Sequence, residues 1–156
     1  MEAVIREAAP ENFDGIFELL LELGKHFGDN KPVDGDKILS IYRGFLERTD
    51  RLEYVVEADG RLVAMMSLTI DESLYEDRPY MIIEELIVTA GCRGRGIGKR
   101  LISLAIVRTL ERGCCVFCVE TEAANEGATR FYRGRDFDRE SILFEMELDR
   151  RGAGHN

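Results

Sequence analysis

A glycine-rich segment, GCRGRGIGKR at residues 91–100, separates an apolar strand-like run, YMIIEELIVT, from an apolar helix-like run, LISLAIVRTL. Four glycines and four basic residues share its ten positions. Because glycine costs conformational entropy wherever it stands, four together indicate a backbone that bends sharply or lies against something. Free amide groups converge where a glycine-rich turn meets a helix N-terminus, and the helix dipole favours negative charge there. The segment therefore predicts a strand, an anion-binding turn and a helix.

Two common phosphate-binding loops do not fit the spacing of this segment. A Walker loop ending at Gly98 and Lys99 needs a glycine at position 93 and a serine or threonine at position 100, and arginine occupies both. A dinucleotide fingerprint read from Gly94 needs a glycine at position 99, where the chain has lysine. Neither a nucleoside triphosphate nor NAD is the expected ligand.

Size and charge limit the class of protein. A chain of 156 residues with 45% hydrophobic content suits one domain with a sizeable core. The net charge of −9 argues against a sequence-independent nucleic-acid binder, which needs a basic face. The sequence contains no apolar run of about 20 residues, and its start, MEAVIREAAPENF, lacks the regions of a signal peptide. We expect a soluble cytoplasmic protein with no membrane or nucleic-acid partner.

Alternation, helical spacing and turn residues predict the order β-α-α-β-β-β-α-β-α-β in one α/β (α+β) domain over residues 1–148. Asp59-Gly60 predicts a two-residue hairpin turn between two strands, and Gly113 predicts the end of the helix after the glycine-rich segment. Residues 142–148, ILFEMEL, alternate as a half-exposed strand should. The tail, 149–156, has nothing to bury and is expected to be disordered.

The four cysteines do not predict a metal site. Cys115 and Cys118 form a C-x-x-C in a strand-like run, where alternation places their side chains on opposite faces. The only histidines are His26 and His155, far from these cysteines in sequence. We expect reduced, structural cysteines and no metal.

Two motifs together resemble the GNAT superfamily of N-acetyltransferases. RGRGIG, at 93–98, matches R-x-x-G-x-G between a strand ending in EELIV and a long helix. Downstream, NEGATRFYRGRDF looks like the family segment N-x-x-A-x-x-F-Y-x-x-x-G-F, with Asp136 in place of the usual glycine. The resemblance covers residues 80–148 and implies a central mixed, mostly antiparallel twisted sheet with helices on both faces.

The resemblance also implies acetyl-CoA as co-substrate. Backbone amides of the glycine-rich segment would hold the pyrophosphate, and the end of the preceding strand would pair with the pantetheine arm as an added strand does. Asn125 occupies the family position for a side-chain contact to the cofactor, and it is also a helix N-cap candidate. The cofactor-binding residues expected on this basis are Leu86, Ile87, Val88, Arg93, Gly94, Arg95, Gly96, Ile97, Gly98, Lys99 and Asn125.

Acetyl transfer to an amine needs a base for the ammonium proton and a donor for the leaving thiolate. Tyr132 matches the family's general acid. For the base we favour Glu84, which lies about 13 Å along the strand from Val88 at the usual rise. Glu120 is the second candidate and Glu85 the third. Strict alternation places Glu84, Leu86 and Val88 on one face of the strand, and Ile83, Glu85 and Ile87 on the other.

The acceptor is expected between residues 28–37 and the acidic segment 71–77, whose charge favours a cationic small molecule or a peptide amine. Two other readings remain, a non-catalytic acyl-CoA sensor or interaction module on the same fold and a structural domain that binds no CoA. The sequence leaves the oligomeric state open, with a homodimer as one option.

Overall fold

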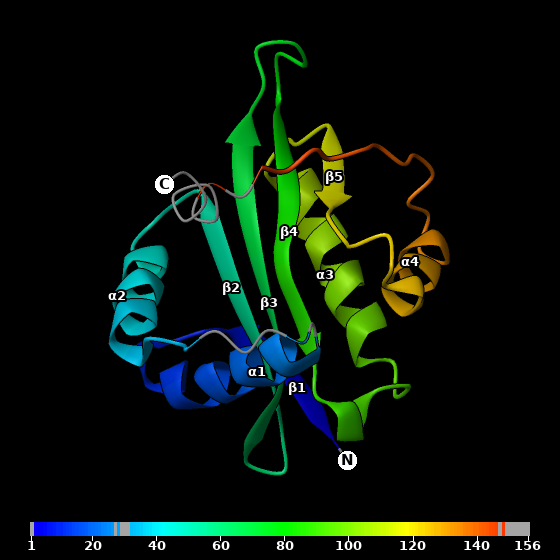
Figure 1. Cartoon of the computed structure of the whole chain (residues 1–156). Helices are drawn as coiled ribbons and strands as arrows, with labels where there is room; N and C mark the ends of the chain where they lie inside the picture. Colours follow the sequence, from blue (N-terminus) through cyan, green and yellow to red (C-terminus); the bar gives the residue numbers. More distant parts are fainter. Residues whose placement is uncertain (1, 27, 29–31, 147, 149–156) are drawn as a thin grey trace, which may run out of the picture. The chain divides into compact units, whose positions relative to one another are not determined.

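The computed structural model describes residues 2–26, 28, 32–146 and 148 (Figure 1). The chain forms two compact units, residues 1–122 and 123–156, which are described separately. The first unit contains β1 (Ala3–Glu7), η1 (Pro10–Asn12), α1 (Phe13–His26), α2 (Gly35–Leu46), β2 (Arg51–Ala58), β3 (Arg61–Glu72), β4 (Pro79–Val88), η2 (Ala90–Cys92), α3 (Ile97–Glu111) and β5 (Val116–Val119). The second unit contains α4 (Glu126–Arg133).

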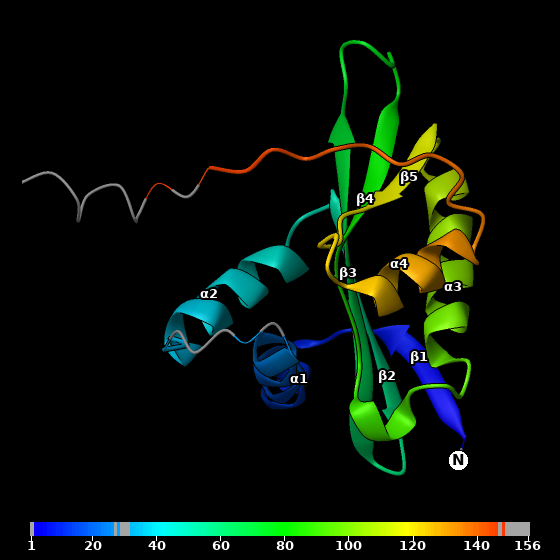
Figure 2. The same cartoon turned by 45° about the vertical axis from the view of Figure 1, so that its right-hand side comes forward.

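The first unit is built on a five-stranded sheet in the order β1-β2-β3-β4-β5. All neighbours are antiparallel except β4 and β5, which are parallel, so the sheet is mixed and mostly antiparallel as predicted. Helices α1 and α2 cover one face and α3 covers the other (Figure 2). Positive φ angles at Asp59 (50°) and Gly60 (73°) form the predicted two-residue turn between β2 and β3.

Periodic apolar residues hold α1 and α2 on the sheet. Ile16 and Leu19 lie three residues apart on α1, and both are buried. They form one core cluster with Tyr42 of α2 and with the neighbouring sheet residues Val55, Met65 and Ile87. These sheet residues therefore mark the face covered by α1 and α2, called the α1/α2 face below.

A β-bulge in β4 overturns the expected alternation along this strand. Ile83 pairs with Leu68 and Glu85 pairs with Ser67, so Glu84 is the extra residue in the ladder. Leu68 and Ser67 are adjacent in β3, so Ile83 and Glu85 lie on opposite faces. The expectation that they share a face is wrong, because a one-residue insertion changes the phase of every residue beyond it.

The C-terminal end differs from the sequence-based expectation in one feature. The predicted strand over residues 142–148 does not form in its described part, residues 142–146 and 148. Its apolar side chains are exposed, Phe144 by 90%. The predicted disordered tail, 149–156, lies outside the described residues.

Among the helices of the described residues, none has the length and apolar character to cross a membrane.

Candidate active site

The glycine-rich segment forms a compact turn at the end of β4. After the 3₁₀ turn η2, Gly94 (φ 74°) and Gly96 (φ 80°) adopt left-handed backbone conformations that favour glycine. Gly96 is the N-cap of α3 and provides no side-chain hydrogen bond, while its carbonyl accepts from Arg100 N at 3.0 Å. The amides of the first turn of α3 have no intrahelical acceptor. Residues 89–98, called the cofactor loop below, thus have the geometry of an anion site.

Replacing Gly96 by alanine tests this backbone conformation. An added Cβ would meet no atom within 4 Å, so the cost is the left-handed φ itself, about 1–2 kcal/mol of folding stability. We expect a loss of this size in chemical denaturation, together with weaker acetyl-CoA binding. Gly91→Ala is the matched control, because Gly91 also has open space and its φ lies outside the left-handed region. A similar loss in the control would contradict the conformational argument.

Arg93 and Arg100, two basic side chains around the cofactor loop, donate hydrogen bonds to backbone carbonyls. Arg93 Nε donates to the Val88 carbonyl at 2.9 Å, and Arg93 Nη2 lies 3.8 Å from a carboxylate oxygen of Glu22. Arg100 Nη1 donates to the Ala3 carbonyl at 2.8 Å. The Arg93 guanidinium is therefore held against the end of β4, whereas the Arg100 guanidinium is held against β1.

The edge of β4 that faces β5 is unpaired next to the cofactor loop. Pairing between the two strands runs from Tyr80 with Val116 to Ile83 with Val119 and then ends. Beyond the bulge, residues 84–88 of β4 have no strand neighbour on this side among the described residues, and Figure 1 shows β5 alongside the other half of β4. The expected contacts Leu86, Ile87 and Val88 belong to this edge, which can pair with an extended ligand.

A polar cluster interrupts the apolar α1/α2 face beside this edge. Arg51 of β2 donates to Glu53 Oε1 at 3.1 Å, to Ser67 Oγ at 2.6 Å and to Thr69 Oγ1 at 3.0 Å. Ser67 Oγ in turn donates to Glu53 Oε1 at 2.9 Å. The side chains of Arg51 and Glu53 are only 8% and 6% exposed. The guanidinium carbon of Arg51 also lies 3.5 Å from the centroid of the Phe45 ring of α2.

Glu85 joins the polar cluster from β4, where it pairs with Ser67. Burial raises the pKa of Glu85, while Ser67 and the charge of Arg51 oppose the rise and the charge of Glu84 adds to it. Burial likewise raises the pKa of Glu53, against opposing contributions from Ser67 and Arg51. Two carboxylates thus share one guanidinium, which leaves a proton-binding site of raised affinity on this face.

Removing the charge of Arg51 is expected to destabilise the fold. Arg51→Met keeps much of the apolar stem but leaves the buried Glu53 carboxylate without its cation. Breaking a buried ion pair in this way costs about 3–5 kcal/mol, which thermal or chemical denaturation would measure. Arg48→Met is the control, because the Arg48–Asp50 pair is exposed and its loss should change stability little. Equal losses in the two variants would contradict a structural role for the polar cluster.

The sequence-based prediction did not include the polar cluster, although the residues of β2 contain a pattern that indicates it. Arg51, Glu53 and Val55 alternate along β2 and therefore share a face, which places two charged residues in line with a core position.

The two base candidates that the sequence favoured lie outside the polar cluster. Glu84 is exposed at the bulge, and Glu120 is exposed directly after β5.

Tyr132 and Asn125 belong to the second unit. Asn125 caps α4 by accepting from Ala128 N at 3.1 Å, so its N-cap role is confirmed. The Tyr132 ring makes edge contacts with Phe131 and Phe137, with centroids 5.3 Å and 5.4 Å apart. Burial raises the pKa of Tyr132 to about 12, so its hydroxyl stays protonated at neutral pH. At Asp136, where the family has glycine, φ is 64°.

The acidic segment expected near the acceptor forms the tip of the β3–β4 hairpin. Leu74 and Tyr75 at this tip are almost fully exposed. The tip lies at the opposite end of β4 from the cofactor loop, roughly 30 Å away at the usual strand rise. The other expected acceptor segment, 28–37, includes residues 29–31, which lie outside the described residues.

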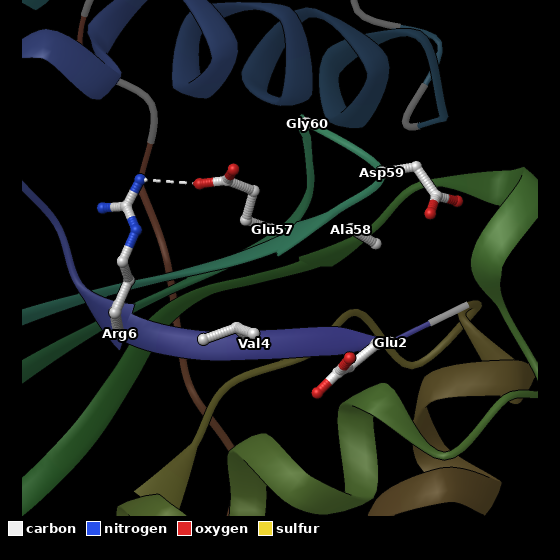
Figure 3. A pocket seen from close by; sticks show the side chains of 7 residues that line it. All are labelled: Glu2, Val4, Arg6, Glu57, Ala58, Asp59 and Gly60. Atoms are coloured by element: carbon white, nitrogen blue, oxygen red, sulfur yellow. Dashed lines mark hydrogen bonds and ion pairs between the residues drawn. The ribbon is translucent and has the colours of Figure 1, made fainter.

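Two surface hollows lie near the β2–β3 turn. One of about 260 Å³ lies between β1 and this turn and is lined partly by Glu2, Arg6 and Glu57 (Figure 3). The other, of about 930 Å³, lies between α1 and the same turn and extends to Thr89 and Cys92 of the cofactor loop. Their carboxylates, which in the larger hollow include Glu11, Glu18 and Glu22, do not suit an anionic ligand.

The cysteines of the described chain carry no disulfide bond. Burial raises the pKa values of Cys114 and Cys118, which keeps both thiols protonated at neutral pH and disfavours them as nucleophiles. Cys118 Sγ donates to the Met81 carbonyl at 3.5 Å. Within the described ranges there is no group of three or more histidine, cysteine, aspartate or glutamate side chains that could hold a metal ion.

Comparisons with known proteins find acetyltransferases among both the sequence relatives and the solved structures. An uncharacterised N-acetyltransferase of Archaeoglobus fulgidus is 27% identical over 86% of this chain and 92% of its own length. The N-alpha-acetyltransferase MAK3 of Arabidopsis thaliana is 29% identical over 69% of this chain. The matched region makes up 56% of the plant protein, so the chain corresponds to little more than half of that relative. In fold, the chain matches the glucosamine-6-phosphate N-acetyltransferase of Arabidopsis thaliana with a TM-score of 0.80, 20% identity and coverage of 96% and 100% of the two chains.

The sequence profile of the Acetyltransferase (GNAT) family matches residues 14–137, which include both compact units in part and every candidate catalytic residue. The fold likeness and the curated relatives agree with this match. The chain belongs to the GNAT family of acetyltransferases.

Proposed function

We propose that this protein transfers an acetyl group from acetyl-CoA to a primary amine of a cationic small molecule or a peptide. The observation that carries the proposal is the unpaired edge of β4, residues 84–88, which runs directly into the glycine turn and the N-terminus of α3. An extended arm that ends in a diphosphate matches this sequence of features, because the strand edge offers backbone hydrogen bonds and the turn offers amides to an anion.

The cofactor loop and the β4 edge would hold acetyl-CoA. The amides of residues 93–99 face the diphosphate, Leu86 to Val88 pair with the pantetheine arm, and Asn125 contributes from the start of α4. The co-substrate supplies an activated acetyl thioester. Arg93 adds positive charge beside the diphosphate without leaving its protein contacts.

Glu85 is the general base in this proposal. It lies on the unpaired half of β4, its carboxyl has a raised pKa, and Ser67 and Arg51 fix its surroundings. It takes the proton from the incoming ammonium group, which makes the amine nucleophilic. Glu84 and Glu120, favoured from the sequence, are the alternatives, and both side chains are exposed.

Tyr132 donates the proton that the departing thiolate needs. Its raised pKa of about 12 keeps this proton in place until the negative charge develops on sulfur. After the attack the nitrogen loses a second proton, which restores the Tyr132 hydroxyl, and the proton taken by Glu85 is released to solvent, so the reaction yields an amide, free CoA and one proton.

The proposed function is tested by incubating the protein with acetyl-CoA, alone and with a panel of amines. Release of the free thiol of CoA measures hydrolysis in the first case and acetyl transfer in the second. The panel contains peptides with free N-termini, peptides with internal lysine, polyamines, aminoglycosides and amino sugars. Saturable thiol release that depends on one of these classes supports the proposal, and the likeness to an N-alpha-acetyltransferase makes peptide N-termini the first class to examine. Tight CoA binding without turnover on any amine would instead favour an acyl-CoA sensor.

A further inference from the structure

We infer that Glu22 of α1 is a positioning residue that holds the start of the cofactor loop in its acetyl-CoA-binding conformation. Glu22 Oε2 accepts from Thr89 Oγ1 at 2.7 Å, and Glu22 Oε1 accepts from Ala90 N at 2.8 Å. The same carboxylate lies 3.8 Å from Arg93 Nη2. One side chain of α1 thus binds three positions of the turn that follows β4. The inference rests on the proposed function.

Glu22 takes the place of a local cap. Thr89 is the N-cap of the 3₁₀ turn η2, and threonine commonly caps such a turn through its own hydroxyl. Here Thr89 makes no side-chain cap hydrogen bond, and its hydroxyl points its proton at Glu22. The Ala90 amide has no acceptor within the turn, as is usual at the start of a helix, and it donates to the same carboxylate. The conformation of the turn therefore depends on a helix 67 residues earlier in the chain.

The contacts also fix the last residues of β4. Thr89 N donates to the Val63 carbonyl of β3, and Arg93 Nε donates to the Val88 carbonyl. Glu22 contacts Thr89, which follows Val88 in the chain, and Arg93, whose side chain binds the Val88 carbonyl. Val88, the last residue of the unpaired edge, is therefore anchored through both. Burial alone would raise the pKa of Glu22, but the hydrogen bonds from Thr89 and Ala90 and the charges of Arg93 and Lys25 lower it, so the carboxylate is ionised at neutral pH.

The sign of its charge makes Glu22 informative. A carboxylate beside a diphosphate site repels the ligand, so removing the charge would by itself strengthen acetyl-CoA binding. If Glu22 positions the cofactor loop, its removal must weaken binding instead, because the loop then samples other conformations in the free protein. Electrostatics and positioning thus predict opposite changes in affinity for the same variant.

The test measures the acetyl-CoA dissociation constant of the full chain by calorimetry, with KM and kcat where turnover is found. We expect Glu22→Ala to weaken binding and raise the KM for acetyl-CoA about tenfold, with kcat at saturating acetyl-CoA within about threefold. Glu22→Gln, which keeps an acceptor oxygen, should recover part of the affinity. Glu18→Ala removes an exposed carboxylate one turn earlier in the same hollow, and should leave binding unchanged or slightly stronger.

Thr89→Val gives a second measurement that keeps the shape of the turn. It removes one of the two strong hydrogen bonds and should weaken binding by a few-fold, and its effect should be largely lost when Glu22 is already alanine. If Glu22→Ala does not fold, as judged by circular dichroism, Thr89→Val and Glu22→Gln decide the question.

Equal affinities of the wild type and the folded Glu22 variants would overturn the role of Glu22 and leave the proposed function intact. Tighter binding in Glu22→Ala would overturn it as well, because the carboxylate would then act only through its charge. A wild-type protein that binds no acetyl-CoA would overturn the proposed function, and the inference with it.

Discussion

Glu85→Gln is expected to lower kcat for acetyl transfer by a factor on the order of 10²–10⁴, the usual contribution of a positioned general base. Glutamine has nearly the same shape as glutamate and can still hydrogen-bond Ser67, so the fold and acetyl-CoA affinity should change little. The result should therefore be a change in kcat rather than in the KM for acetyl-CoA.

The pH profile identifies Glu85 more directly than the rate does. Since burial raises the pKa of this carboxyl, activity should fall as the pH drops through a value above the usual range for glutamate. Without the base, only the unprotonated amine reacts, so the acid limb of the profile should move up to the pKa of the acceptor, about 7.7–8.0 for a peptide α-amine. One buffer series is enough to compare the acid limb of the wild type with the acid limb of Glu85→Gln.

Glu84→Gln and Glu120→Gln are the matched controls, since each removes one carboxylate from or near the same pair of strands. We expect each to change kcat by less than about threefold. A large loss in Glu84→Gln or Glu120→Gln with a normal Glu85→Gln would transfer the base role to the residue that the sequence favoured.

Tyr132→Phe is the second variant with a large expected effect, a loss of about 100-fold or more in kcat. The substitution removes only the hydroxyl and keeps the ring that packs against Phe131 and Phe137, so α4 and its aromatic contacts should persist. Acetyl-CoA affinity should stay near that of the wild type, because a proton donor to the departing thiolate acts in the transition state.

Tyr75→Phe controls for the loss of a tyrosine hydroxyl elsewhere. Tyr75 is 92% exposed at the tip of the β3–β4 hairpin, and its variant should have wild-type kcat. An unchanged rate in Tyr132→Phe would remove Tyr132 from the mechanism, and a lowered acetyl-CoA affinity with normal kcat would assign it to binding.

Much of the fold follows from residues that are close in sequence. The Asp59-Gly60 turn and the Asn125 cap are each determined within a few residues, and both were predicted. The glycine spacing at 93–98 likewise predicted a turn, since only glycine readily adopts the left-handed angles seen at Gly94 and Gly96. Family membership also came from two local motifs and agrees with the profile match.

Tertiary structure decided the features that depend on strand partners and distant helices. The bulge at Glu84 became visible only in the pairing of β3 with β4, and it put Ile83 on the face opposite Glu85 and Ile87. Strict alternation grouped Ile83 with these two residues, because an inserted residue in a ladder leaves no mark in the pattern of apolar residues. The described part of the expected strand over 142–148 stayed unpaired although its alternation is clear, since alternation shows that a segment can form a strand and not that a partner edge receives it.

Local sequence alone predicts a strand, a glycine turn and a helix N-terminus suited to an anion, because those residues are consecutive and their backbone conformations are local. The carboxylates around Ser67 and the helix that contacts the cofactor loop follow only from the packed fold. Ser67 lies 14 residues from Glu53, and Thr89 lies 67 residues from Glu22. Contacts over such separations form when the whole sheet and its covering helices pack together, and no local pattern of residue types encodes them.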